Sequence, residues 1–349
     1  MPVGNSGSIV TKGRARISAV VACVPKRRVD NSEMRVKFGD SIDQVTKMTG
    51  VKERRKAGAD VTTADLCVEA AKCLTEAQLN DVDALIFVSQ TPDYRLPATA
   101  CVLQSKLALR TGIIALDVNL GCSGYPYALW LGTMMIDSGA ARKVLLLVGD
   151  TITKLVEPSD RATAPLFGDC GTATLLEPGL KDAFFVLGTD GRGGQNLIVP
   201  GGAFRDRVFD PRNTNPDGTL FMDGTEVFNF TLKSVPLLMQ DLVTASGTPV
   251  SAFDRIYFHQ ANEFMINHLR KKIGAEKEQT PVNIGKFGNT SSASIPLLIA
   301  DFESSGSSRE KNLLVAMLGF GVGFSWAAAA MSLHADALVQ LIEYPEDLP

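Results

Sequence analysis

Residues 113–125 read IIALDVNLGCSGY, an apolar strand-like run that ends in a glycine-flanked turn and leads into an apolar helix-like run. The turn contains Cys122, so we expect its thiol at the start of a helix. The first N–H groups of a helix are unpaired and its dipole is positive there, and both favour thiolate over thiol. Cys122 is therefore a candidate nucleophile. The alternative is a packed core cysteine, because free cysteines are among the most buried residues.

Two further segments favour the catalytic interpretation. The first is FDRIYFHQAN at 253–262, where a strand-like run delivers His259 at its carboxyl end. The second is GNTSSASIP at 288–296, where Asn289 lies in a turn before another apolar helix-like run. The chain has 3 histidines, and His259 is the one placed at a strand exit. Together these segments predict a Cys–His–Asn set.

The two halves of the sequence repeat one another. Each half has a helix-like run, a strand, a glycine turn into an apolar helix, and two more strands. In this repeat Cys122 corresponds to Asn289, and Gly139 follows the first at the same spacing as Gly306 follows the second. Both helix starts are therefore expected near the centre, outside the carboxyl ends of the strands, where α/β proteins bind ligands.

Four segments in this order resemble the signature set of ketoacyl–acyl-carrier-protein synthase III, the initiating condensing enzyme of the thiolase superfamily. They are NLGCSGY at 119–125, HQAN at 259–262, GNTSSAS at 288–294 and GFGVGFSW at 319–326. The resemblance covers nearly the whole chain. It implies an α/β, thiolase-like duplicated fold with five layers in the order αβαβα, in which two mixed sheets enclose the central helices.

The repeat and the local composition divide the chain into parts. Residues 1–13 are rich in Gly and Ser and are expected to form a disordered tail. Residues 14–185 form the N-terminal thiolase-like half with the nucleophilic cysteine, and residues 186–349 form the C-terminal half with the histidine and asparagine. The stretch 188–217, rich in Gly, Arg and Asn, is expected to be a long loop that joins the halves.

The resemblance also implies a mechanism, a decarboxylative Claisen condensation with no cofactor and no metal. Cys122 takes an acyl group from a thioester, and the backbone N–H groups of Cys122 and Val322 form the oxyanion hole. A malonyl-acyl-carrier-protein then loses carbon dioxide, and His259 and Asn289 donate hydrogen bonds to the resulting enolate. The enolate attacks the acyl-cysteine to give a 3-oxoacyl product. The substrates are thioesters of coenzyme A or acyl-carrier protein.

Some positions depart from the pattern of the initiating enzymes. One aromatic residue and two arginines that help hold the coenzyme A nucleotide are replaced by Gln44, Met48 and Phe264. Arg161 does match a nucleotide-contacting arginine. Because loss of a stacking ring and two cations weakens the grip on a nucleotide, an acyl-carrier-protein donor becomes more plausible, and the choice between it and acyl-coenzyme A stays open.

Further binding residues follow from the resemblance. Asn262 matches a pantetheine contact. Arg270, Lys271 and Lys272 match a basic patch that can meet an acidic carrier protein, and a solvated helix end explains them equally well. Leu96 falls where the family often has a phenylalanine that lines the acyl pocket from the partner subunit of a homodimer. A smaller side chain there would admit a different acyl group.

Composition excludes several other classes of function. A net charge of −3, without a Lys/Arg block or a zinc-type cysteine spacing, gives no support for nucleic-acid or metal binding. The longest apolar run is too short to span a membrane. The 6 cysteines are scattered without CxxC pairs, which is typical of a reducing compartment. We therefore expect a cytoplasmic protein, and the family implies a homodimer.

Alternative functions remain. An acyltransferase on the same scaffold would pass the acyl group from Cys122 to an amine or hydroxyl, and the same residues would serve it. A degradative thiolase is disfavoured because the glycine loop at 319–326 lacks a second cysteine. A hydroxymethylglutaryl-type synthase would need a general-base glutamate that the motifs do not provide. An inactive acyl-binding paralogue is disfavoured by the retention of all three candidate catalytic residues.

Overall fold

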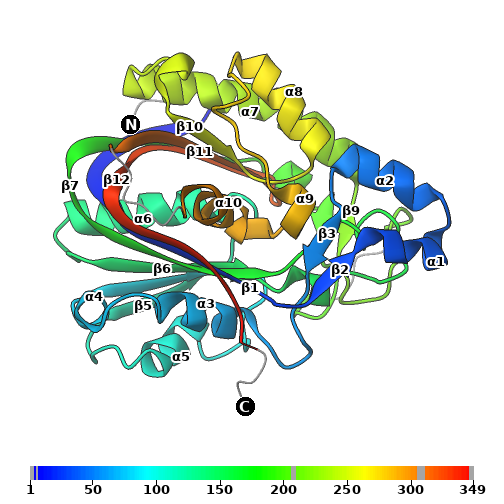
Figure 1. The fold of residues 1–349 in the computed structure, drawn as a ribbon, viewed down its shortest axis with the longest axis horizontal. Coiled ribbons are helices and arrows are strands. Elements are labelled where there is room, and N and C mark those ends of the chain that lie inside the picture. Colours follow the sequence, from blue (N-terminus) through cyan, green and yellow to red (C-terminus); the bar gives the residue numbers. More distant parts are fainter. Residues whose placement is uncertain (1–3, 5–6, 206–209, 305–310, 346–349) are drawn as a thin grey trace.

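A computed structural model describes residues 4, 7–205, 210–304 and 311–345. Two central helices, α6 (Gly124–Asp137) and α10 (Ser294–Glu303), lie between two layers of strands (Figure 1). Other helices cover the outer faces of both layers, so the predicted αβαβα order is confirmed. On one outer face lie α7 (Gly224–Ser246) and α8 (Glu263–Ile273), and on the other α3 (Thr63–Ala71), α4 (Glu76–Asn80) and α5 (Thr99–Lys106).

The strands of both layers belong to one hydrogen-bonded sheet, whereas the sequence predicted two separate sheets. The strand order is β10-β11-β12-β1-β7-β6-β4-β5. Three long strands supply the continuity: β1 (Ile9–Val24), β7 (Cys170–Thr189) and β12 (Ser325–Glu343). The other strands are β4 (Ala84–Val88), β5 (Ile114–Val118), β6 (Val144–Asp150), β10 (Arg255–Phe258) and β11 (Leu313–Gly321).

Each long strand contributes to both layers. The first part of β7, residues 170–176, pairs with β6, and its last part, 184–189, pairs with β12. The first part of β12 pairs with β11, and its last part, 338–343, runs parallel to β1. Irregularities in β1 between Gly13 and Ala15 and between Ile17 and Ala19 let the strand bend. Figure 1 shows these strands curving around the central helices.

The predicted repeat is visible in the strand pairing. In the N-terminal half β4 is parallel to β6, and β6 is antiparallel to β7. In the C-terminal half β10 is parallel to β11, and β11 is antiparallel to β12. The predicted boundary between residues 185 and 186 falls inside β7, because this strand continues from one layer into the other. Gly306, one position of the predicted repeat, lies outside the described residues.

The expectation of a disordered tail is wrong for residues 9–13. They form the start of β1 and pair with residues 183–187 of β7. The Gly- and Ser-rich composition was misleading because Ile9, Val10 and Thr11 are β-branched and suit a strand. Residues 1–3 and 5–6 of the predicted tail lie outside the described residues.

The predicted long loop at 188–217 contains some regular structure. It includes the 3-10 turn η3 (Gly191–Gly193) and the strand β8 (Leu197–Ile198), which pairs with β9 (Phe221–Met222). Residues 206–209 lie outside the described part. The remaining elements are β2 (Arg28–Asp30), η1 (Asn31–Met34), α1 (Arg35–Phe38), α2 (Ser41–Thr49), β3 (Glu53–Arg55), η2 (Ile152–Lys154), η4 (Val250–Ala252), α9 (Ile284–Phe287) and η5 (Ser291–Ala293).

The apolar sequence of α6 fits its central position. Tyr125 is fully buried, and its hydroxyl lies 3.2 Å from Thr174 Oγ1 of β7. A Cβ atom at Gly132 would lie 2.8 Å from a methyl of Leu176, so glycine permits close packing of helix on strand. α10 is buried along most of its length. Within the described residues, no helix has the length and apolar character needed to cross a membrane.

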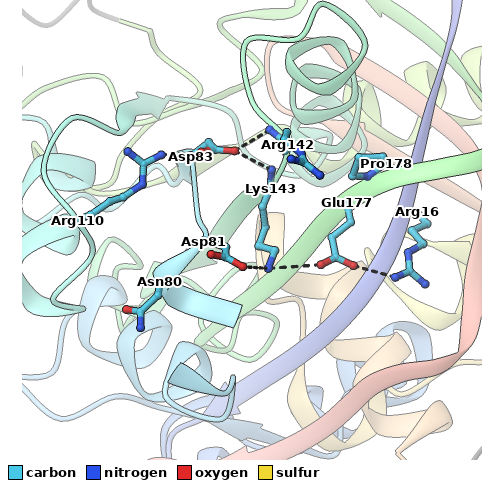
Figure 2. A pocket seen from close by; sticks show the side chains of 9 residues that line it. All are labelled: Arg16, Asn80, Asp81, Asp83, Arg110, Arg142, Lys143, Glu177 and Pro178. Atoms are coloured by element: carbon cyan, nitrogen blue, oxygen red, sulfur yellow. Dashed lines mark hydrogen bonds and ion pairs between the residues drawn. The ribbon is translucent and has the colours of Figure 1, made fainter. Parts of the chain in front are cut away.

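A network of ion pairs lines a cavity of about 670 Å³ at the amino ends of β4 and β6 (Figure 2). Asp83 bonds Arg110 at 2.6 Å, and Glu177 bonds Arg16 at 3.0 Å. Lys143 lies 3.6 Å from Glu177. Because Cys122 follows the carboxyl end of β5, this network is at the opposite end of the parallel strands from the candidate nucleophile.

Candidate active site

Cys122 lies in the turn between β5 and α6, directly before the residue that caps the helix. The turn is closed by a hydrogen bond from the N–H of Gly124 to the carbonyl of Gly121, at 2.7 Å. A Cβ atom at Gly121 would collide with the side chain of Gln90, which follows β4. Glycine at this position therefore lets the turn lie close to the end of β4. Cys122 is 8% exposed. The thiol is thus held inside the molecule on a rigid turn.

The resting thiol is protonated. Burial raises the pKa of Cys122 to about 12, and the Asp150 carboxylate acts in the same direction. The backbone N–H groups of Val322 and Cys122 and the Ser291 hydroxyl lower the pKa, but burial outweighs them. The sequence predicted that the helix start would favour a thiolate. The structure contradicts this, because burial keeps the resting thiol protonated. The two N–H groups expected to form the oxyanion hole are close enough to the sulfur to lower the pKa of the thiol.

His259 follows β10, and its ring is oriented by the central helix of the C-terminal half. Its Nδ1 lies 2.7 Å from the hydroxyl of Ser294, the first residue of α10. The ring packs edge-on against Phe320, with 5.6 Å between centroids. Burial lowers the pKa of His259 to about 3, so the imidazole is neutral at physiological pH. A Ser294 hydroxyl that donates to Nδ1 leaves the hydrogen on Nε2, which then serves as a donor.

Asn289 is held by backbone bonds to the N-terminal half. Its N–H donates to Leu166 at 2.9 Å, and its carbonyl accepts from Gly168 at 3.1 Å. The side-chain oxygen of Asn289 accepts from the N–H of Ser291 at 2.9 Å. Since the oxygen is engaged locally, the amide NH₂ group is the part left to donate to a ligand.

Asp150 is a buried carboxylate that joins the two halves at the site. One of its oxygens accepts from the N–H of Gln90 at 2.7 Å and from the Ser89 hydroxyl at 3.1 Å. The other accepts from the hydroxyl of Ser292 at 2.8 Å and from its N–H at 3.3 Å. Asp150 therefore ties the loop beside the Cys122 turn to the turn that carries Asn289. Sequence reasoning missed it, although a carboxylate at the carboxyl end of a buried strand was a usable signal.

The three candidate catalytic residues line one pocket of about 90 Å³. Asn262 is also in its wall, at the start of α8, where its side-chain oxygen accepts from the N–H of Met265 at 2.7 Å. The rest of the wall is mostly apolar and was not predicted. Its members are Leu166, Phe167, Leu197, Met222, Gly224, Val227, Thr231, Ala261, Met265, Phe320 and Gly321.

The other predicted binding residues lie elsewhere. Arg270, Lys271 and Lys272 form the last turn of α8, at the opposite end of the helix from Asn262, and do not line the pocket. Arg161 is exposed in the loop after β6 and does not line it either. The side chain of Leu96 is 79% exposed and is absent from the pocket wall of its own chain.

Two of the three positions at which the sequence departs from the expected nucleotide-binding pattern carry exposed apolar groups. Met48, near the end of α2, is 69% exposed, and Phe264, in the first turn of α8, is 61% exposed. Phe264 stacks on Phe228 of α7 with 6.2 Å between ring centroids. Helices α2 and α8 are in contact. No His, Cys, Asp and Glu cluster that could hold a metal ion is found among the described residues.

A buried thiol, a neutral imidazole and a carboxamide around one pocket, on a duplicated αβαβα fold, define a thiolase-fold enzyme that transfers acyl groups. The family model of 3-oxoacyl-[acyl-carrier-protein] synthase III matches residues 116–191, and the model of its C-terminal part matches residues 229–333. This chain belongs to the 3-oxoacyl-[acyl-carrier-protein] synthase III family.

Individual relatives agree with the family models. A beta-ketoacyl-[acyl-carrier-protein] synthase III of Rhodopirellula baltica is 32% identical over 338 residues, which cover 90% of this chain and 97% of the relative. The crystal structure of a 3-oxoacyl-(acyl-carrier protein) synthase from Burkholderia xenovorans LB400 is 48% identical, with a TM-score of 0.93, and covers 97% of this chain and 100% of that chain. The priming beta-ketosynthase of the R1128 polyketide pathway is 25% identical, with a TM-score of 0.82 over 93% of this chain and 98% of that one.

Proposed function

We propose that this protein catalyses a decarboxylative Claisen condensation between an acyl thioester and malonyl-acyl-carrier-protein, giving a 3-oxoacyl product. One observation carries the proposal. The Cys122 thiol, the neutral ring of His259 and the amide of Asn289 line a single pocket of about 90 Å³. The chemistry needs no metal or cofactor, because it consists of thioester exchange and loss of carbon dioxide.

In the first half-reaction Cys122 attacks the acyl thioester. Because burial raises the pKa of the thiol to about 12, the proton has to leave as the carbon–sulfur bond forms. The leaving thiolate of the acyl donor can receive that proton, whereas the ring of His259 is a poor base because its pKa is lowered to about 3. The backbone N–H groups of Cys122 and Val322 are proposed to hold the oxyanion, since both are close enough to the sulfur to affect the thiol pKa.

In the second half-reaction the malonyl group loses carbon dioxide and leaves an enolate. Nε2–H of His259 and the NH₂ group of Asn289 are proposed to hydrogen-bond its oxygen. Donors on neutral groups suit this step because no proton is removed from carbon. The low pKa of His259, about 3, keeps the ring uncharged over the working pH range. Each donor contributes about 3 kcal/mol by analogy with oxyanion-hole groups, or on the order of 10⁴-fold for the two.

The donor and the carrier are proposed to meet the protein around α8. Asn262 at its start lines the pocket and is placed to contact the pantetheine arm. Exposed Met48 and Phe264 favour the apolar surface of a carrier protein over a nucleotide. Arg270, Lys271 and Lys272 at its end offer charge for an acidic carrier.

We propose that the protein is a homodimer of the cytoplasm. Strand β5 is the last strand of the sheet, and its Ile114 is 37% exposed. Tyr127 and Trp130 of the adjoining α6 are only partly buried. A partner that covers these groups would extend the sheet, and exposed Leu96 could then reach the partner's acyl pocket. Free cysteines fit a reducing compartment. Light scattering at micromolar concentration should give the dimer mass, and a monomer mass would contradict this.

The decisive experiment measures carbon dioxide release from malonyl-acyl-carrier-protein by enzyme that has first been acylated on Cys122. Acyl-coenzyme A and acyl-carrier-protein donors are tested in parallel, and intact mass reports the acyl-enzyme. We expect release of carbon dioxide and formation of a 3-oxoacyl thioester. Acyl transfer to an amine or alcohol without release would assign an acyltransferase instead. No acyl adduct with either donor would leave only a binding role.

A further inference from the structure

A further cavity of about 180 Å³ lies between the β2–β3 pair and the loop that follows β6. Three cations line this cationic pocket, namely Arg27, Arg54 and Lys56, and its described lining includes no carboxylate. Phe167 lines both the cationic pocket and the catalytic pocket. The other lining residues are Val29, Met34, Thr153, Val156, Pro158 and Ala164.

Arg54 is a buried cation whose hydrogen-bond partners are all neutral. It is 5% exposed. Its Nε donates to the side-chain oxygen of Asn31 at 2.8 Å, and one Nη donates to the carbonyl of Phe167 at 3.2 Å. The other Nη faces the sulfur of Met34 at 3.4 Å, which is a weak acceptor. Burial lowers the pKa of Arg54 to about 10, so it stays charged at neutral pH. A buried charge without a counterion is costly, and an anion would relieve the cost.

The other two cations are also without ion pairs among the described residues. Neither Arg27 nor Lys56 has a carboxylate within 4.0 Å in the described part. In the cavity of Figure 2, by contrast, Arg16, Arg110 and Lys143 are each paired with a carboxylate, and Arg142 is the one cation of its described lining without an ion pair. In the cationic pocket none of the three cations has such a direct pair among the described residues.

The nearest negative groups form no direct ion pair with the cations of the cationic pocket among the described residues. Asp169 interacts electrostatically with Arg54 and Lys56, but its oxygens accept from Ala57 and from Thr153. A neighbouring cavity of about 460 Å³ shares Arg27 and Lys56 and adds one cation and two carboxylates. These are Lys26, Asp60 and Asp65, of which Asp65 is already paired with Lys106 at 2.9 Å.

We propose that the cationic pocket binds a small anion that carries a phosphate or carboxylate group. Arginine and lysine together recognise such groups through charge-assisted hydrogen bonds. The anion is either a free small molecule or a phosphate group of the acyl donor. Its position is close to the chemistry, because the Phe167 carbonyl that Arg54 holds belongs to the 166–168 segment that bonds the backbone of Asn289.

Binding is tested by titrating inorganic phosphate into the full-length protein and observing the heat of binding by calorimetry. Lys56→Gln and Arg27→Gln remove partly exposed cations and leave buried Arg54 in place. The matched control is Arg142→Gln, which removes one cation from the cavity of Figure 2. We expect saturable binding that weakens about tenfold in each of the first two variants and is unchanged in the control, since a charged hydrogen bond contributes about 1.5 kcal/mol or more. No saturable binding by the wild type, or equal weakening in all three variants, would overturn the proposal.

Two kinetic arms distinguish the sources of the anion. KM is measured in phosphate-free buffer for an acyl-coenzyme A and for the acyl-pantetheine that lacks its phosphates. If the donor's own phosphate occupies the cationic pocket, Lys56→Gln raises KM for the first substrate alone. If a free anion is the ligand, both KM values stay unchanged while phosphate binding weakens. Phosphate binding is measured by calorimetry and needs no turnover. A failure of the proposed condensation can therefore be distinguished from a failure of the cationic pocket to bind an anion.

Discussion

Replacing Asp150 with asparagine is expected to slow condensation and, at the same time, to let the Cys122 thiol react at lower pH. The carboxylate accepts from Gln90 and Ser89 on one oxygen and from Ser292 on the other. Asparagine keeps one acceptor and turns an NH₂ group towards donors, so at least one charge-assisted bond is lost. Such a bond contributes about 1.5–3 kcal/mol. When the lost bond is the one to the turn that carries Asn289, this turn is held less firmly, and condensation slows by about 10- to 100-fold.

The reactivity of the Cys122 thiol should increase in the same variant. The negative charge of Asp150 raises the pKa of Cys122, so its removal lowers that pKa. The assay is the rate of Cys122 alkylation by iodoacetamide as a function of pH, followed by intact mass. The alkylation profile of Asp150→Asn should shift to lower pH while its turnover falls. Asp137→Asn, at the other end of α6, serves as a control and should change neither. An unshifted profile, or normal turnover in Asp150→Asn, would refute the role given to this carboxylate.

Four further outcomes are expected. Cys122→Ser should give no acyl-enzyme by intact mass at an unchanged unfolding temperature, since the oxygen is a weak nucleophile; an acyl adduct that forms on this variant at the wild-type rate would contradict this. Asn289→Ala should still form the acyl-enzyme but release carbon dioxide from malonyl-acyl-carrier-protein about 10²-fold more slowly, and equal loss of both steps would refute the division of roles. Because the pKa of His259 is lowered to about 3, the unfolded state binds a proton on this residue more tightly than the folded state, and the wild type loses stability as pH drops below 6.5. The free energy of urea unfolding of His259→Gln should therefore rise relative to that of the wild type by about 2–3 kcal/mol between pH 7 and pH 4.5. A difference that stays constant with pH would contradict this. Gly132→Ala should lower stability by about 1–3 kcal/mol, measured by thermal unfolding, because its methyl would meet Leu176.

Much of the site could be predicted because its parts are local in sequence. Cys122, His259 and Asn289 each follow a recognisable strand or turn, and the repeat explains why they converge. Asp150 was missed because its function depends on donors from two distant segments. The protonated state of Cys122 was also missed, since a helix start is visible in the sequence and the depth of burial is not.

The architecture was predictable in outline. The order of elements and the layers followed from the repeat and the family motifs. The single continuous sheet was not predicted, because the pairing of β1 with both β7 and β12 depends on register between segments far apart in the chain. The apolar pocket wall was missed for the same reason, since its members come from several separate segments.

The long strands also constrain how this chain can fold. β1, near the start of the chain, has β12, near its end, as a direct neighbour, and β12 supplies strand to both layers. During synthesis the sheet therefore cannot close until residues 325–343 have left the ribosome. Pairing of such distant segments is slow, and the edges of β1 and β11 stay open in the meantime. The two repeated halves thus share their long strands, and neither half can complete its own layer of strands alone.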